Sequence, residues 1–226
     1  MQVVLFQNRI DAGQKLAERL SSLNQNKPQE SRRETIIIVA VPRGGVIIGD
    51  VIASKLDVNL DIVVSRKIAA PHNPEFAIGA VMPDGSYFVN PQLVNTLYIP
   101  LDYVQRQASA EVKEIHRRLM SYRGTMEYDD IFKGKTVVLV DDGIATGATI
   151  IASGQWIKNK HHCKKLVIAA PVAPLEILDD LNQVADDVVV LYTPEHFIAI
   201  GRFYENFDQV SDNEVKEIMR KYGYEV

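Results

Sequence analysis

Two adjacent aspartates follow an apolar run and precede a loop of small residues, a spacing that suits a phosphorylated ligand. The apolar run covers residues 137–140, the carboxylates are Asp141 and Asp142, and the loop covers 145–149 before a helical pattern begins. Small side chains let backbone N–H groups and two hydroxyls surround a phosphate, and the start of a helix attracts negative charge. The loop therefore predicts a phosphate site at the carboxyl end of a buried strand.

The two aspartates must face another part of such a ligand, because a carboxylate repels a phosphate. Hydroxyl groups close to the phosphate, as in a phosphorylated sugar, would donate hydrogen bonds to both carboxylates. Taken by themselves, Asp141 and Asp142 are also compatible with a divalent-cation site or a helix cap.

Cations follow two other expected strands. Arg43, Gly44 and Gly45 come after the first, and Arg66 and Lys67 come after the second. Glycines permit a tight turn and a close approach of the backbone to a ligand, and arginine adds a permanent charge. Ligands of open parallel sheets bind beyond the carboxyl ends of the strands, so we expect the three clusters to meet. Each cationic cluster alone is also typical of a structural turn or an ordinary surface.

The elements that must position these clusters alternate along the chain. Apolar β-branched runs predict strands over residues 35–41, 60–65, 77–82, 87–89, 136–140, 166–170 and 187–191. Helical spacing of apolar residues predicts helices over 12–23, 46–55, 101–122, 149–159, 174–182 and 213–221, and the polar stretch 24–34 predicts a loop. This alternation predicts an α/β fold with a central, mainly parallel sheet flanked by helices.

The interval 69–133 interrupts the alternation. It starts with three prolines, continues with an expected hairpin and ends with the long helix over 101–122, whose apolar residues form one stripe. We expect a helical flap or arm inserted into the fold. The stripe is compatible with packing against the same domain, with a subunit contact and with a mobile cover over a site.

Composition excludes several classes of protein. The chain has 226 residues, with 25 Lys plus Arg and 29 Asp plus Glu, and its formal charge of −4 argues against a nucleic-acid partner. Cys163 is the single cysteine, which excludes a disulfide scaffold and favours a reducing compartment. No apolar run reaches the about 18 residues of a membrane span. We therefore expect a cytoplasmic protein without a membrane partner.

The residues at the three strand ends carry a resemblance to a known family. The 137–149 run resembles the phosphoribosyl pyrophosphate motif of the type I phosphoribosyltransferases, and Arg43-Gly44-Gly45 resembles their pyrophosphate loop. Lys67 stands where that family has a basic residue after the next strand. Most of the chain is similar to a group of uncharacterised phosphoribosyltransferase-like proteins, which share Arg66-Lys67, the segment 74–80 and a Tyr-x-x-Phe ending at 204–207.

The resemblance implies a division of the ligand 5-phosphoribosyl 1-pyrophosphate (PRPP) among these residues. Asp141 and Asp142 would hold the ribose hydroxyls, whereas Arg43, Gly44 and Lys67 would meet pyrophosphate. The 5′-phosphate would be held by Ala145, Thr146, Gly147, Ala148 and Thr149. Mg²⁺ would be bound through oxygens of PRPP and not by a dedicated metal site. Of these residues, Asp141, Asp142, Lys67 and Arg43 are the expected catalytic set.

The implied activity is transfer of the phosphoribosyl group from PRPP to an unidentified, nitrogenous base, with release of pyrophosphate. A non-catalytic regulator that binds PRPP or a nucleotide in the same fold is the alternative from another class. Hydrolytic or synthetic chemistry on a related sugar phosphate would need the same three clusters. Ala145 stands where the hypoxanthine–guanine branch has an acidic residue, which argues against that branch.

The resemblance also implies one phosphoribosyltransferase domain over residues 1–226, in which base specificity comes from a hood. We expect the core over about 35–68 and 134–192, the flap or arm over about 69–133, and the hood over about 1–25 and 192–226. Phe197 is the candidate for stacking on a planar base, although the hood aromatics are equally compatible with a small satellite core. A homo-oligomer, most simply a dimer, is the expected assembly.

Overall fold

The apolar β-branched runs form a five-stranded central sheet in the computed structural model, which describes residues 4–24 and 28–226. Its strands are β1 (Ile36–Ala40), β2 (Asn59–Ile62), β6 (Thr136–Val140), β7 (Lys165–Val172) and β8 (Asp187–Tyr192). They lie in the order β2-β1-β6-β7-β8, and each neighbouring pair is parallel. The predicted α/β fold with a parallel central sheet is confirmed.

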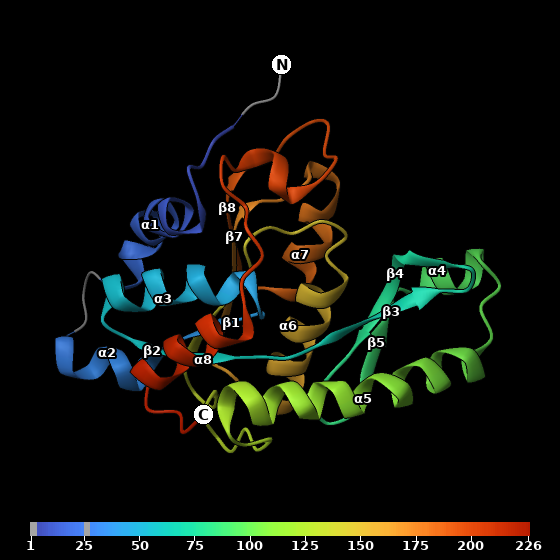
Figure 1. The fold of residues 1–226 in the computed structure, drawn as a ribbon, viewed down its shortest axis with the longest axis horizontal. Helices are drawn as coiled ribbons and strands as arrows, with labels where there is room; N and C mark the ends of the chain where they lie inside the picture. Colours follow the sequence, from blue (N-terminus) through green and yellow to red (C-terminus); the bar gives the residue numbers. More distant parts are fainter. Residues whose placement is uncertain (1–3, 25–27) are drawn as a thin grey trace.

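Helices cover both faces of this sheet (Figure 1). One face carries α1 (Arg9–Leu20) and α3 (Gly44–Leu56), which pack against each other, and the other carries α6 (Ala148–His161) and α7 (Leu178–Val184). The strands are buried on both sides because helices cover both, which explains why β1 and β6 are almost continuous runs of Ile, Val and Leu.

The register of the central strands decides which polar residues meet. Ala40, the last residue of β1, pairs with Val140, the last residue of β6. The Val41 N–H then donates to the Val140 carbonyl at 2.9 Å. The segment after β1 and the segment after β6 therefore leave the sheet side by side.

A second, three-stranded antiparallel sheet stands beside the first. It contains β3 (Arg66–Ala70), β4 (Asn73–Val81) and β5 (Tyr87–Val89), followed by α4 (Pro91–Thr96) and the long α5 (Leu101–Arg123). Helix α5 runs along this sheet toward α8 (Asp212–Lys221), and it contacts β3, β4 and α8 (Figure 1). The predicted apolar stripe of α5 is thus packed against its own chain from Val104 to Tyr122, whereas Leu101 at its start is exposed. In the described ranges no helix has both the length and the apolar character needed to cross a membrane.

A buried ion pair joins the long helix α5 to strand β2 of the central sheet. Arg123, the last residue of α5, donates from Nε to Asp61 Oδ1 of β2 at 2.8 Å and from Nη2 to Oδ2 at 3.1 Å. Its guanidinium carbon lies 4.2 Å from the centre of the Tyr128 ring. Burial raises the pKa of Asp61, and the hydrogen bond from Arg123 offsets part of that effect. The paired geometry explains how two charges are accommodated inside the core.

A segment near the start of the chain, residues 5–6, pairs with the segment 203–205. The Leu5 and Phe6 N–H groups both donate to the Phe203 carbonyl at 3.0 Å, and the Glu205 N–H donates to the Phe6 carbonyl at 2.8 Å. Helix α1, which follows the first segment, is thereby joined to the segment that leads into α8. Residues 1–3 and 25 of the expected hood, like part of the expected loop 24–34, lie outside the described residues.

Several expected elements need correction. The expected loop 24–34 ends in a helix, α2 (Gln29–Thr35), and the strand expected over 60–65 stops at Ile62, so that Arg66 begins β3. Helix α1 starts three residues earlier than expected, because the Asn8 side chain accepts from the Ile10 and Asp11 N–H groups and caps it. The helix expected over 174–182 is divided into the 3₁₀ turn η2 (Leu175–Ile177) and α7.

Candidate active site

The acidic pair lies at the carboxyl end of β6. The Asp142 N–H donates to Asp141 Oδ1 at 2.8 Å, so the backbone turns directly after the strand. Burial raises the pKa of Asp141 well above its usual range, and the charge of Asp142 adds to this rise. Two carboxylates this close offer several acceptor oxygens to a ligand that carries neighbouring hydroxyl groups.

The glycines after β1 pack against this pair. A Cβ atom on Gly44 would lie 1.8 Å from Asp142 Oδ2, and one on Gly45 would lie 3.0 Å from the Asp141 Cα atom. No other residue type leaves this space, so the two glycines let the two strand ends come together. The structure therefore brings the predicted Arg-Gly-Gly cluster and the predicted acidic pair into contact.

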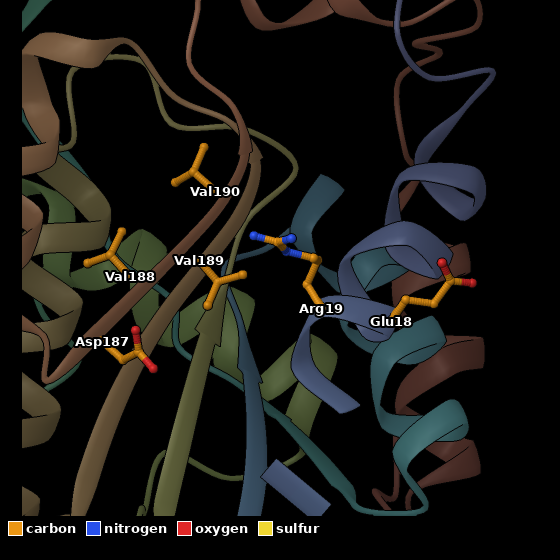
Figure 2. A pocket seen from close by; sticks show the side chains of 6 residues that line it. All are labelled: Glu18, Arg19, Asp187, Val188, Val189 and Val190. Carbon is orange, nitrogen blue, oxygen red and sulfur yellow. The ribbon is translucent and has the colours of Figure 1, made fainter. Parts of the chain in front are cut away.

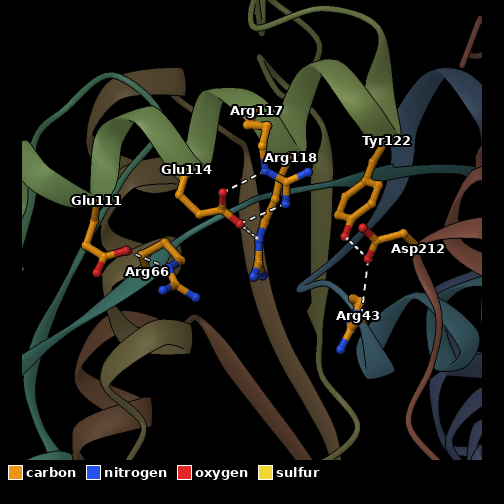
Figure 3. Close-up of polar contacts among 8 residues, drawn as sticks. All are labelled: Arg43, Arg66, Glu111, Glu114, Arg117, Arg118, Tyr122 and Asp212. Atoms are coloured by element: carbon orange, nitrogen blue, oxygen red, sulfur yellow. Dashed lines mark hydrogen bonds and ion pairs between the residues drawn. The ribbon is translucent and has the colours of Figure 1, made fainter.

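Arg43 lies beside these glycines and is held by another part of the chain. Its Nη1 donates to Asp212 Oδ1 at 3.2 Å, and the Tyr122 hydroxyl donates to the same oxygen at 2.6 Å (Figure 3). The hydrogen bond from Tyr122 lowers the pKa of Asp212, and the bond from Arg43 acts in the same direction. Burial, together with the Asp212 contact, raises the pKa of Tyr122 to about 12. Asp212 therefore stays ionised between two donors.

The loop after the acidic pair leads into the amino terminus of α6. Gly147 caps this helix with a φ of +74°, a left-handed conformation that favours glycine. Ala145 and Thr146 are exposed, and Ala148 and Thr149 are half-buried at the start of the helix. The free N–H groups at the start of a helix of this length, next to an exposed small-residue loop, provide the geometry that an anion needs.

Lys67 lies in a different sheet from the other predicted site residues. It is an exposed residue of β3, in register with Ala80 of β4, and not the end of a central strand. The neighbouring Arg66 donates from Nε to Glu111 Oε2 of α5 at 2.7 Å (Figure 3). A contact between Lys67 and pyrophosphate stays a prediction.

Sequence reasoning missed a cation that contacts the acidic pair. Arg9, the first residue of α1, donates from Nε to Asp142 Oδ2 at 2.7 Å. The Asn8 cap is a local signal that starts the helix at this residue. Nothing in the local sequence indicates that this helix start lies at the end of β6, however, because 133 positions separate the two residues.

Tyr204 of the C-terminal segment contacts the same corner. The Tyr204 hydroxyl donates to the Asp142 carbonyl at 2.6 Å, and burial raises the pKa of this phenol, so it remains a donor. Phe197 is half-buried and stacks on Phe203, with 5.8 Å between ring centres and 29° between ring planes. The ring of Phe197 thus belongs to a small aromatic cluster, and a role in stacking on a base stays a prediction.

The residues of this site can supply only part of a metal shell. In residues 4–24 and 28–226, no group of three or more histidine, cysteine or carboxylate side chains is placed to hold a metal ion. Asp141 and Asp142 provide carboxylate oxygens, but one of these already accepts from Arg9. Mg²⁺ commonly keeps waters and takes one or two carboxylates together with substrate phosphates, and this donor set fits that habit.

A cavity of about 430 Å³ lies elsewhere, between α1 and the edge strand β8. It is lined by Glu18, Arg19, Asp187, Val188, Val189 and Val190 (Figure 2). None of the predicted site residues lines it. We place the candidate active site at the strand ends, because the charged groups and the helix start gather there.

Comparisons with known proteins show which proteins the chain is similar to. Residues 7–189 match the family model described as phosphoribosyl transferase domain. A protein named "Putative phosphoribosyl transferase", found in two strains of Mycobacterium tuberculosis, is 37% identical over 214 residues, which is 93% of this chain and 45% of the relative. The chain therefore spans about half the length of the curated relatives it matches. A crystal structure of a protein from Thermus thermophilus has a TM-score of 0.78 and 35% identity, and the match covers 97% of this chain and 99% of that one.

Proposed function

The chain belongs to the phosphoribosyl transferase domain family, and on this premise we propose that it binds PRPP and transfers the phosphoribosyl group to a nitrogenous acceptor, releasing pyrophosphate. The contact between Gly44 and Asp142 carries this proposal. It joins an Arg-Gly-Gly turn to an acidic pair, and the small-residue loop at the start of α6 follows that pair directly in the chain.

Each part of PRPP has a chemically matched group. The 5′-phosphate would bind at the start of α6, where Ala145, Thr146, Gly147, Ala148 and Thr149 offer backbone N–H groups and two hydroxyls. The ribose hydroxyls would donate to Asp141 and Asp142. Pyrophosphate would meet Arg43 and the Gly44 backbone, with Lys67 as a further cation. Binding of pyrophosphate would draw Arg43 away from Asp212, which holds it at 3.2 Å.

The proposed reaction depends on positioning and on neutralising charge. A nitrogen atom of the acceptor forms a bond to the anomeric carbon while the carbon–oxygen bond to pyrophosphate breaks, and the leaving group takes the electron pair. Holding the sugar by both its phosphate and its hydroxyls restrains that carbon, which lowers the entropic part of the barrier. Mg²⁺, held mainly by oxygens of PRPP, would neutralise the leaving group.

The acceptor is the least constrained part of the proposal. Ala145 offers no acid or base to handle a proton of the acceptor, in contrast to the acidic residue of the hypoxanthine–guanine branch. The aromatic cluster around Phe197 and Phe203 is the apolar surface from which a base site would be built.

Calorimetric titration of PRPP with Mg²⁺ tests the ligand. We compare the parent protein with the double variant Asp141→Asn, Asp142→Asn. The matched control carries Asp179→Asn and Asp180→Asn, because this second adjacent pair is exposed in the first turn of α7. We expect the parent and the control to bind and the site variant to lose binding. A folded parent that does not bind would contradict the proposal.

Measurement of pyrophosphate release with a panel of nitrogenous bases then tests the reaction. Release with one base identifies the acceptor class. Binding of PRPP without turnover on any base would favour the non-catalytic regulator over the transferase.

A further inference from the structure

Arg9 is built into the corner where the acidic pair and the Arg-Gly-Gly turn meet. Its Nε lies 2.7 Å from Asp142 Oδ2, and 2.9 Å from the point where a Cβ on Gly44 would lie. We propose that Arg9 is a positioning residue, which fixes the Asp142 carboxylate in the orientation that receives a ribose hydroxyl. This inference rests on the proposed function, because it assigns the ribose to Asp142.

Three contacts hold Arg9 itself in one place. Besides Asp142, its Nη1 donates to the Asp208 carbonyl at 2.7 Å, and its guanidinium carbon lies 3.9 Å from the centre of the Phe207 ring. A planar guanidinium can make all of these contacts at once, whereas an ammonium group cannot. The side chains of Arg9 and Asp142 are only 11% and 13% exposed. This ion pair is therefore part of the packed structure and not a mobile surface contact.

The Asp142 residue is fixed from two sides as a result. The Tyr204 hydroxyl holds its backbone carbonyl at 2.6 Å, and Arg9 holds its carboxylate. A ligand that meets an already ordered carboxylate does not have to order it, so its affinity is higher. Removing Arg9 would leave the Asp142 backbone held by Tyr204 but would release the Asp142 carboxylate.

Arg9 also offsets the negative charge of the pair. Burial and the charge of Asp142 raise the pKa of Asp141, while the charge of Arg9 lowers it. Removing Arg9 would therefore leave the two neighbouring carboxylates without this compensating charge.

Titration of two fragments of PRPP tests the role of Arg9. Ribose 5-phosphate carries the hydroxyls, and pyrophosphate with Mg²⁺ does not. We expect Arg9→Met to weaken ribose 5-phosphate binding by about tenfold or more, as for the loss of a charged hydrogen bond, and pyrophosphate binding by less. Arg9→Lys keeps the charge but loses the planar guanidinium, and its affinity for ribose 5-phosphate should lie between the affinities of Arg9→Met and the parent. The matched control is Arg19→Met, an exposed arginine on the same helix, which should bind like the parent.

A double-mutant cycle separates positioning from helix packing. If Arg9 acts through Asp142, Arg9→Met should change ribose 5-phosphate binding by less than about twofold when Asp142→Asn is already present. An undiminished loss in that background would overturn the inference, as would tighter binding by Arg9→Met, which would mean that Arg9 competes with the ligand.

Failure of the inference is distinguishable from failure of the proposed function. Equal ribose 5-phosphate binding by the parent and Arg9→Met would overturn the inference alone. Absence of binding by the folded parent to either fragment would overturn the proposed function and the inference with it. Should Arg9→Met not fold, Arg9→Lys decides the question, since binding at parental affinity by that variant would contradict a role for the planar fork.

Discussion

The substitution Gly44→Ala tests whether close approach of the two strand ends builds the ribose site. The new Cβ atom would lie 1.8 Å from Asp142 Oδ2 and 2.5 Å from its Cγ. Real Cβ atoms essentially never show contacts under 3.0 Å, so the carboxylate and the turn must separate by about 1.2 Å. The Asp142 side chain cannot make this movement and keep its 2.7 Å contact with Arg9.

The size of the effect follows from that contact. Losing a hydrogen bond between charged groups costs about 1.5–3 kcal/mol in unfolding free energy. Alanine regains at most about 1 kcal/mol over glycine, because position 44 is the first residue of α3 and not in its interior. The net loss of stability is therefore between about 0.5 and 3 kcal/mol. Affinity for PRPP with Mg²⁺ should fall by about tenfold or more, since the displaced carboxylate is the proposed ribose ligand.

Urea unfolding and calorimetric titration of the same preparation measure both effects. The control is Gly134→Ala, where a Cβ meets nothing within 4 Å but φ is +69°. This control should lose about 1 kcal/mol of stability from backbone strain and bind PRPP like the parent. If Gly44→Ala kept both its stability and its affinity, the argument that only glycine fits between β1 and β6 would be wrong.

Three further predictions concern charges and backbone around the site. Asp212→Asn removes the partly exposed ion pair with Arg43, so unfolding free energy should change by about 1 kcal/mol or less, while calorimetry should show severalfold tighter pyrophosphate binding. Arg123→Met leaves buried Asp61 without its cation and should cost about 3–5 kcal/mol in urea unfolding at about pH 8. Burial raises the pKa of Asp61 in the folded protein above its value in the unfolded chain, so the folded protein binds this proton at a higher pH than the unfolded chain does. The loss of stability should therefore shrink as the pH falls to about 5. Gly147→Ala forces a side chain into a φ of +74°, which should cost about 1–2 kcal/mol and weaken ribose 5-phosphate binding by calorimetry.

The elements and clusters that sequence reasoning predicted correctly depend on local signals. Runs of β-branched residues identify β1 and β6, and a spacing of three and four residues identifies the buried stripe of α5. The contact between Gly44 and Asp142 was also within reach, because residues after neighbouring parallel strands must share one edge of the sheet.

The start of the second sheet was harder to predict, because the boundary between β2 and β3 lacks a turn signal. Residues 60–70 form one nearly continuous extended run, and periodicity alone does not show that β2 ends at Ile62 and that Arg66 starts an antiparallel strand. Pro74 lies inside β4, which starts four residues before the strand expected over 77–82. The register of β3 against β4 shifts around Ala69, and irregular pairing of this kind accommodates a proline.

The residues that hold the site in place were not predictable from one sequence. Arg9 and Asp142 are separated by 133 positions, and Arg43 and Asp212 by 169. Such contacts depend on where segments far apart in the sequence lie in the folded chain. No motif or spacing in one sequence predicts these positions. The sequence shows which residues are arginines, but not which carboxylate each arginine contacts.

The two ion pairs at the candidate site differ in a way that bears on the proposed reaction. Arg9 and Asp142 are almost buried, whereas Arg43 and Asp212 are 30% and 41% exposed. An exposed pair contributes about 1 kcal/mol or less, so pyrophosphate can draw Arg43 away at low cost, whereas the buried pair stays in place.

Asp212 would keep a hydrogen-bond partner after Arg43 is released. Tyr122, whose pKa is raised to about 12, keeps its proton at neutral pH and continues to donate to Asp212. The pyrophosphate half of the proposed site can therefore rearrange while the ribose half keeps its geometry. In a transfer reaction the leaving group must depart while the sugar stays fixed, and this asymmetry between the two ion pairs provides for both.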